Sequence, residues 1–257
     1  MGILGIIITI VLIVLIILFF INFFKDPYTL SNLKNGQNLT TVSASSLATN
    51  SSNIPSTNFA YSIWFYVNDF NYRYGSPKVI FGRMGAPSNS NSGSSSIADI
   101  DGLDPCPAVV LGAVENNIDI HLGCYPGVNQ QPTTPGGNTV VHTCSVSNVP
   151  IQKWVNLTVS VYGRSMDIYI DGKLVRTCLL PGIANVNNNA DVYITPAGGF
   201  SGWTSKFQYY PNALNPQEVY NIYVKGYGGN MFTNFLNSYQ VQIALMQNGT
   251  TQGSITI

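Results

Sequence analysis

The amino-terminal apolar run constrains this chain more than any other feature. Gly2 to Phe24 carries no charge, and Ile3 to Ile21 is apolar apart from Gly5 and Thr9. At 1.5 Å per residue, about 22 helical residues extend about 33 Å, enough to cross a hydrocarbon core of about 30 Å. A signal peptide would have a basic start, a shorter apolar centre and a small-residue cleavage site, and the run has none of these. Residues 1–24 are therefore predicted to be a single-pass transmembrane anchor, with residues 3–24 in contact with the lipid bilayer.

The segment after the apolar run has few residues that could pack a core. Residues 25–58 are rich in Ser, Thr and Asn. We expect them to form a flexible stalk, whose root-mean-square reach would be about 30 Å for roughly 34 residues.

The composition of residues 59–257 favours strands joined by turns. Gly, Asn, Ser, Thr and Tyr are abundant, whereas Glu occurs only at Glu115 and Glu218. Long solvent-exposed helices are therefore disfavoured, and an all-β domain is expected.

Period-two patterns place the main strands. In Tyr61–Val67 and Val155–Val161, alternate apolar residues form one face. Met166–Ile170 repeats the pattern, and Asp171-Gly172 predicts a tight turn into Lys173–Cys178. These short strands predict a two-sheet antiparallel sandwich.

Two features are expected near the carboxyl terminus. Asn215 as N-cap, Pro216 as first helical residue and Glu218 at the capping-box position predict one short helix. Gln240–Gln247 and Ser254–Ile257, on either side of Asn248-Gly249, predict a terminal hairpin.

The segments Trp154–Tyr162, Met166–Val175, Gly199–Tyr210 and Ala213–Tyr223 resemble, in order, the central hairpins, closing strand and helix of laminin-G-like, concanavalin A-like jelly-roll domains. The resemblance covers roughly residues 59 to 225 and implies a concanavalin-like jelly roll. The anchor, stalk and single domain also resemble, in layout, virion membrane proteins of large DNA viruses.

Charge and motif content restrict the function. Basic and acidic residues both number 11, so the chain has no basic face for nucleic acid. Related glucanases carry E-x-D-x-x-E on one strand, which is absent here, and Asp167 and Asp171 flank a turn that they are expected to solvate. We therefore expect a protein that is not an enzyme.

Four cysteines, Cys106, Cys124, Cys144 and Cys178, permit three disulfide pairings. If Ile118–Cys124 pairs with Thr139–Ser145, Cys124 with Cys144 is plausible and Cys106 with Cys178 remains. Four reduced, buried thiols are the alternative. A zinc site of His121, Cys124, His142 and Cys144 would require a strand to break, because His121 and Cys124 point to opposite faces.

Asp99, Asp101 and Asp104 bring three carboxylates together beside Gly102, and calcium favours such oxygen-rich loops. Their spacing is not that of an EF-hand, and a solvated acidic turn is the competing interpretation. Calcium is the cofactor that this loop would hold.

Four sequons begin at Asn38, Asn50, Asn156 and Asn248, and Asn156 falls on the outward face of its strand. They permit a lumenal domain. Lys25 and Lys34, by contrast, favour a cytoplasmic domain by the positive-inside rule. A viral inner membrane would reconcile the two signals.

Three functions remain open. The first is a structural or interaction protein, such as a minor capsid protein that links a virion inner membrane to capsid proteins. The second is a membrane-anchored lectin that binds glycans through aromatics such as Tyr125, Trp203 or Tyr227. The third, a divergent hydrolase, would require Glu115 or Glu218 to lie beside another carboxylate in a cleft.

Overall fold

The computed structural model describes residues 11–12, 15–16, 19, 26–47, 57–83, 86–87, 100–101, 104–133, 139–228, 242–247 and 250–256. Residues 28–227 form one compact unit, and residues 1–27 and 228–257 are grouped apart from it.

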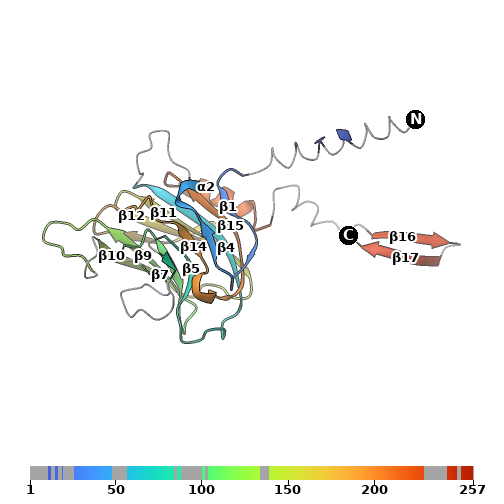
Figure 1. The fold of residues 1–257 in the computed structure, drawn as a ribbon, viewed down its shortest axis with the longest axis horizontal. Coiled ribbons are helices and arrows are strands. Elements are labelled where there is room, and N and C mark those ends of the chain that lie inside the picture. Colours follow the sequence, from blue (N-terminus) through green and yellow to red (C-terminus); the bar gives the residue numbers. More distant parts are fainter. Residues whose placement is uncertain are drawn as a thin grey trace. The chain divides into compact units, whose positions relative to one another are not determined.

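The compact unit is a sandwich of two antiparallel sheets, visible as two layers in Figure 1. In the larger sheet the order is β1 (Thr29–Ser31), β15 (Ser201–Tyr210), β4 (Phe59–Asp69), β11 (Trp154–Tyr162), β12 (Ser165–Ile170) and β13 (Lys173–Leu179), and β2 (Lys34–Asn35) also pairs with β15. In the smaller sheet the order is β10 (Val140–Val146), β9 (Ile118–Cys124), β8 (Ala108–Leu111), β5 (Lys78–Arg83), β14 (Val192–Ile194) and β3 (Thr40–Val42).

The core lies between the sheets, where the period-two pattern predicts it. Tyr61, Ile63 and Phe65 of β4 are at most 1% exposed, as are Val155, Leu157, Val159 and Val161 of β11. The alternation leaves Trp64 and Tyr66 on the outer face of the larger sheet. The two-sheet antiparallel sandwich expected from the sequence is therefore confirmed.

Short elements connect or flank the strands. These are the 3-10 helices η1 (Ala44–Ser46) and η2 (Pro196–Gly198), the ladder of β6 (Ala86–Pro87) with β7 (Ile100–Asp101), and the helix α2 (Pro216–Val224). The capping box of α2 has formed, since Asn215 accepts from the Glu218 backbone N–H and Glu218 accepts from the Asn215 backbone N–H.

The prediction of a flexible stalk over 25–58 is wrong for residues 29–42. β1 and β2 pair with β15, and β3 pairs with β14, so this segment contributes strands to both sheets. The sandwich therefore begins at about Tyr28 rather than residue 59. A composition poor in large apolar residues does not prevent backbone pairing at a sheet edge, because the ladder hydrogen bonds are made by the main chain.

The carboxyl-terminal strands β16 (Gln242–Gln247) and β17 (Thr250–Thr256) form an antiparallel hairpin. This hairpin belongs to the second group of residues and not to the sandwich unit, which ends at Tyr227.

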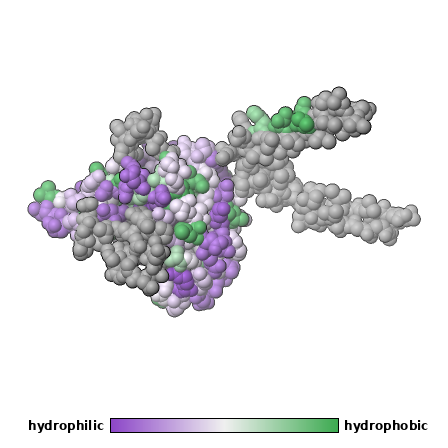
Figure 2. Space-filling model, viewed as in Figure 1, coloured by the Kyte–Doolittle hydropathy of each residue, from purple (hydrophilic) through white to green (hydrophobic). Residues whose placement is uncertain are grey.

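Most of the predicted membrane span lies outside the described residues. Val11, Leu12, Leu15, Ile16 and Phe19 are helical and between 45% and 64% exposed. Figure 2 shows the described part of this segment in the hydrophobic colour, whereas the visible face of the sandwich is mostly hydrophilic. Among the residues that the structure describes, no helix is long and apolar enough to cross a membrane.

Candidate functional site

A row of aromatic side chains crosses three adjacent strands on the outer face of the larger sheet. Trp203 of β15 is directly opposite Tyr66 of β4, and Tyr66 is directly opposite Trp154 of β11. Their ring centroids lie 5.7 Å and 5.8 Å apart, with interplanar angles near 58°. Directly opposed residues on one face of a sheet are close enough for such ring contacts.

Tyr227, beyond α2, extends this row. Its ring stacks on Trp154 at 4.4 Å with an interplanar angle of 11°. Its backbone carbonyl accepts a hydrogen bond of 2.7 Å from the Ser205 hydroxyl, which ties it to β15. We call Trp203, Tyr66, Trp154 and Tyr227 the aromatic row.

The aromatic row is open to solvent. Trp203 is 41% exposed and Tyr227 44%, while Tyr66 and Trp154 are half-buried. Trp64 differs, because it is buried and stacks on Tyr223 of α2 at 5.6 Å. Four aromatic rings in a chain of successive contacts, two of them more than 40% exposed, form a surface on which a flat apolar ligand face can stack.

Polar groups flank the aromatic row. Asn35 of β2 is opposite Trp203 and exposed. Gln152 and Lys153 precede Trp154, and Lys153 forms an ion pair of 3.2 Å with Asp171. The surface thus places amide and charged groups, which can exchange hydrogen bonds with hydroxyls, beside stacked rings.

An open pocket of about 650 Å³ lies at the same end of the sandwich. Its lining, mostly polar, consists of Phe70, Val114, Glu115, Asn116, Asn117, Ser147, Asn148 and Ile151. Phe70 follows the end of β4, and Ile151 is three residues before Trp154. We call the end of the sandwich where β4 ends and β11 begins the Trp154 end. The opposite end, where β4 begins, we call the Tyr28 end.

Two of the three aromatics nominated from the sequence, Trp203 and Tyr227, belong to the aromatic row. Tyr125 follows β9 of the smaller sheet, at the Tyr28 end. The sequence did not point to Tyr66 and Trp154 as site residues, because their grouping depends on strand register. Their positions on the face opposite the core were the available signal.

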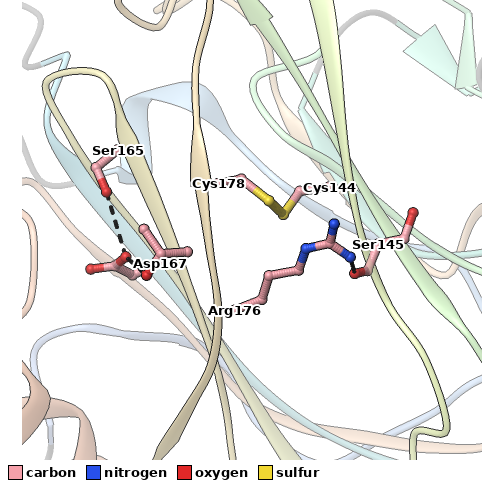
Figure 3. Close-up of a disulfide and its surroundings, with 7 residues drawn as sticks. Cys144, Ser145, Ser165, Asp167, Arg176 and Cys178 are labelled. Atoms are coloured by element: carbon pink, nitrogen blue, oxygen red, sulfur yellow. Dashed lines mark hydrogen bonds between the residues drawn. A yellow bond between two sulfur atoms is a disulfide. The ribbon is translucent and has the colours of Figure 1, made fainter.

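The disulfide joins Cys144 and Cys178, in β10 and β13 at the edges of the two sheets (Figure 3). Beside it, the Arg176 guanidinium donates to the Ser145 carbonyl. The pairing of Cys124 with Cys144 is therefore wrong, as is that of Cys106 with Cys178. β9 and β10 do pair, but their register sets Cys124 opposite Val140 and Cys144 opposite Ile120.

Cys106 and Cys124 are free thiols and fully buried. Burial raises the pKa of each thiol to about 11. A thiol that stays protonated and inaccessible behaves as a small core residue.

The residues of the zinc alternative are not brought together. Cys124 and Cys144 face the core, whereas the His121 imidazole contacts the Thr143 hydroxyl at 2.9 Å. Within the described ranges, no group of three or more metal-ligating side chains is found.

The calcium residues are only partly described. Asp99 lies outside the described residues, and Asp101 is in β7. The Asp104 carboxylate accepts a hydrogen bond of 2.6 Å from the Thr139 hydroxyl.

The sequon asparagines differ in accessibility. Asn38 is exposed, and Asn50 and Asn248 lie outside the described residues. Asn156 is 0% exposed, so its assignment as a glycosylation candidate is wrong. Asn156 does lie on the face of β11 that points away from the core, but it is buried there. Its side-chain amide donates to the Ser62 hydroxyl at 3.1 Å.

The carboxylates considered for hydrolysis make local contacts. Glu218 belongs to the capping box of α2. Glu115 accepts from Asn117 at 2.7 Å, and no second carboxylate is among the residues that line its pocket. Asp167 accepts from Thr177 at 2.6 Å, and Asp171 pairs with Lys153.

Solved structures with a similar fold include toxin domains. The receptor binding domain of botulinum neurotoxin C/D mosaic serotype is 14% identical, with a TM-score of 0.48 over 76% of this chain and 43% of that one. The botulinum neurotoxin serotype G binding domain is 15% identical, with a TM-score of 0.47 over 76% and 46%. This chain thus spans less than half of their length.

Comparison with curated protein sequences finds no significant match. The family model described as the concanavalin A-like lectin/glucanases superfamily, laminin G type, matches residues 41–220. This range contains most strands of both sheets and the first half of α2. The chain therefore belongs to the concanavalin A-like lectin/glucanase superfamily.

Proposed function

We propose that this protein is a non-catalytic, membrane-anchored carbohydrate-binding module, and that the aromatic row is its binding surface. The observation that carries the proposal is the contact chain Trp203–Tyr66–Trp154–Tyr227 on an exposed sheet face, flanked by amide groups. Of the functions considered from the sequence, the lectin is the one that requires such a surface.

Sugar chemistry matches this surface. A pyranose has a face of C–H groups, which packs on an aromatic ring, and equatorial hydroxyls, which hydrogen-bond at its edge. Trp203 and Tyr227 expose ring surface. The Asn35 amide oxygen accepts from the Gln37 backbone N–H and the Gln152 amide nitrogen donates to the Asn68 carbonyl, so Asn35 would donate to a sugar hydroxyl and Gln152 would accept from one. A neutral glycan would therefore fit without requiring a strongly charged site.

The anchor in this proposal is residues 3–24. An uncharged apolar run of this length can satisfy its backbone in lipid only as a helix. The described residues of the run are helical, apolar and exposed, which supports contact with an apolar medium.

The absence of catalysis is part of the proposal. Glycoside hydrolysis requires two carboxyl groups about 5 to 10 Å apart that are free to exchange protons. Glu218 instead caps a helix, and Asp171 is held by Lys153, so both have structural roles.

The test is glycan binding by the full-length protein in nanodiscs, first on an array and then by titration with the best glycan. We expect Trp203→Ala and Tyr227→Ala each to weaken binding about tenfold or more, which corresponds to a loss of about 1.4 kcal/mol or more of binding free energy with the stacking contact. Tyr125→Ala removes a similarly exposed aromatic outside the aromatic row and should leave affinity unchanged. A blank array, or equal losses in all three variants, would reject the proposal.

A structural tether is the second candidate, and the amino-terminal strands favour it. β1 and β2 join the residues after the anchor to the larger sheet, and β3 joins them to the smaller sheet. A pull on the anchor would therefore be resisted by ladder hydrogen bonds in both layers. Co-purification under mild detergent tests this role: stoichiometric capsid or envelope proteins, with a blank glycan array, would favour the tether.

A further inference from the structure

We infer that the Tyr28 end of the sandwich rests on the interface of the bilayer in which residues 3–24 are anchored, with the aromatic row held at the far end. This docking rests on the anchor of the proposed function but not on its glycan specificity. The partner is a lipid surface, and the first argument for it is the length of chain between anchor and domain.

That length is short. The predicted span ends at Phe24, and the Tyr28 carbonyl already accepts from the backbone N–H of Tyr209 at 3.3 Å. Four residue steps cover at most about 14 Å when fully extended. Thr29 then pairs with Gln208, so only these few residues separate the end of the predicted span from the first strand of the larger sheet.

Strand register identifies the residues at this end of the larger sheet. Tyr210, Ala60 and Ser160 are opposite one another on β15, β4 and β11. Two positions further along β11, Tyr162 is opposite Ser165, which is opposite Leu179. Tyr28, Tyr162 and Leu179 therefore lie at one end of the sheet, and they are 41%, 70% and 75% exposed.

The smaller sheet contributes to the same end. The chain runs on from Leu179 to Ala184, which bridges Cys124 at the end of β9. The Tyr125 backbone N–H donates to the Ile183 carbonyl at 2.9 Å. Tyr125, Val128 and Ile183 are 49%, 94% and 44% exposed, so both layers place apolar or aromatic side chains here.

The chemistry of these residues suits the membrane–water interface. Tyrosine positions its ring among lipid headgroups and its hydroxyl toward water, and aliphatic side chains gain by leaving water. Arg164, in the turn after Tyr162, donates to the Leu180 carbonyl at 3.1 Å and adds a positive charge near the headgroups. Since most of the surface is uncharged, docking should occur on zwitterionic lipid.

The opposite end then faces away from the membrane. Tyr66 and Trp154 lie six residues along their strands from Ala60 and Ser160. At about 3.3 Å per residue, the aromatic row is about 20 Å further from the lipid than the Tyr28 end. A large ligand could therefore reach the aromatic row although the domain has no long stalk.

The test measures lipid proximity at single labelled cysteines in the full-length protein, reconstituted in phosphatidylcholine vesicles with doxyl-labelled lipids. Tyr162→Cys and Val128→Cys report on the Tyr28 end. Val114→Cys and Tyr74→Cys, 56% and 59% exposed, are the matched controls in loops of the Trp154 end. The native thiols Cys106 and Cys124 are fully buried and should not label in the folded protein.

We expect at least twofold stronger lipid quenching at positions 162 and 128 than at 114 and 74, with or without anionic lipid. Equal quenching at all four positions in protein that floats with the vesicles would overturn the docking alone. Failure to float would refute the anchor, and the docking with it. If the labels at 162 and 128 are buried without lipid quenching, and the particle has twice the protein mass, the partner of the Tyr28 end is a second copy of this chain and the lipid docking is refuted.

Discussion

Asn156 and its neighbours on the outer face of the larger sheet are buried although they point away from the core. Asn156 donates to Ser62, and the Thr158 hydroxyl is 3.1 Å from that of Ser62. α2 lies over the same face, where Ile222 packs against Ala60 and Tyr210. A buried polar group is tolerated only when it is hydrogen-bonded, so these residues form a network beneath the helix.

Replacing Asn156 should therefore destabilise the sandwich. Asn156→Ala leaves the Ser62 hydroxyl and neighbouring backbone groups with fewer partners, and we expect a loss of about 1–3 kcal/mol in the free energy of unfolding. Asn38→Ala, at an exposed sequon, should change it by less than about 0.5 kcal/mol. Urea denaturation measures both, and equal losses would show that Asn156 is not part of a buried network.

His121 should make stability depend on pH. Burial lowers the pKa of its imidazole below the ordinary value, and the nearby Asp119 carboxylate only partly opposes this. The unfolded chain then binds a proton more readily than the folded chain, so this contribution is present above pH 6.5 and is lost as the pH falls through the window below it. Between pH 7.5 and pH 5, the free energy of unfolding should fall less for His121→Gln than for the unsubstituted protein, as denaturation at the two pH values measures. An equal fall in both proteins would exclude His121 as the cause.

At the scale of elements, the edge strands determine how the sandwich is held together. β1, β2 and β3 add the segment after the anchor to both sheets. At other edges, the Cys144–Cys178 disulfide links β10 to β13. The local sequence patterns of these strands predict neither the pairing of β1, β2 and β3 with the sheets nor the disulfide.

The amino-terminal strands predict a protection pattern in hydrogen exchange. Amides of residues 29–31 and 40–42 that donate in the sheet ladders should exchange at least tenfold more slowly than unpaired amides of similar sequence. Exposed loop residues 126–132 provide the comparison within the same protein. Fast exchange of all amides in residues 29–42 would instead support the flexible stalk predicted from the sequence.

The disulfide predicts selective effects of cysteine replacement. It closes a separation of 34 residues, for which chain entropy gives about 2–4 kcal/mol of stabilisation. Cys144→Ala with Cys178→Ala should lower the free energy of unfolding by about this amount, and non-reducing peptide mapping should recover these two cysteines linked. Recovery of a Cys124–Cys144 peptide would contradict the observed register.

At the scale of the whole molecule, an apolar segment and a β-sandwich are joined by very few residues. The sandwich begins at Tyr28, only four residues after the end of the proposed anchor at Phe24. We therefore expect membrane attachment to depend on the apolar segment, and the orientation of the sandwich to depend on the residues of its Tyr28 end.

Charges in the apolar segment should release the protein from membranes. Leu12→Lys with Ile16→Lys adds an insertion cost of about 5–7 kcal/mol at the middle of the span. We expect the carbonate-resistant membrane fraction to fall by more than half, while Leu12→Phe with Ile16→Leu keeps it unchanged. Full retention of the lysine variant would refute the anchor.

The sequence by itself determined what depends on neighbouring residues. Period-two alternation predicted β4, β11 and β12, the Asp171-Gly172 turn predicted their connection to β13, and the capping residues predicted α2. Together these segments were enough to indicate a laminin-G-like sandwich.

Only the tertiary structure decided what depends on residues far apart in the chain. The register of β9 and β10 places Cys124 and Cys144 at positions that are not opposite each other. Asn156 is fully buried on the sheet face over which α2 packs. The alignment of β15, β4 and β11 assembled Trp203, Tyr66 and Trp154 into one surface. The physical reason is that a strand's own pattern specifies which side chains share a face, whereas burial and backbone pairing over the whole domain select its neighbour and register.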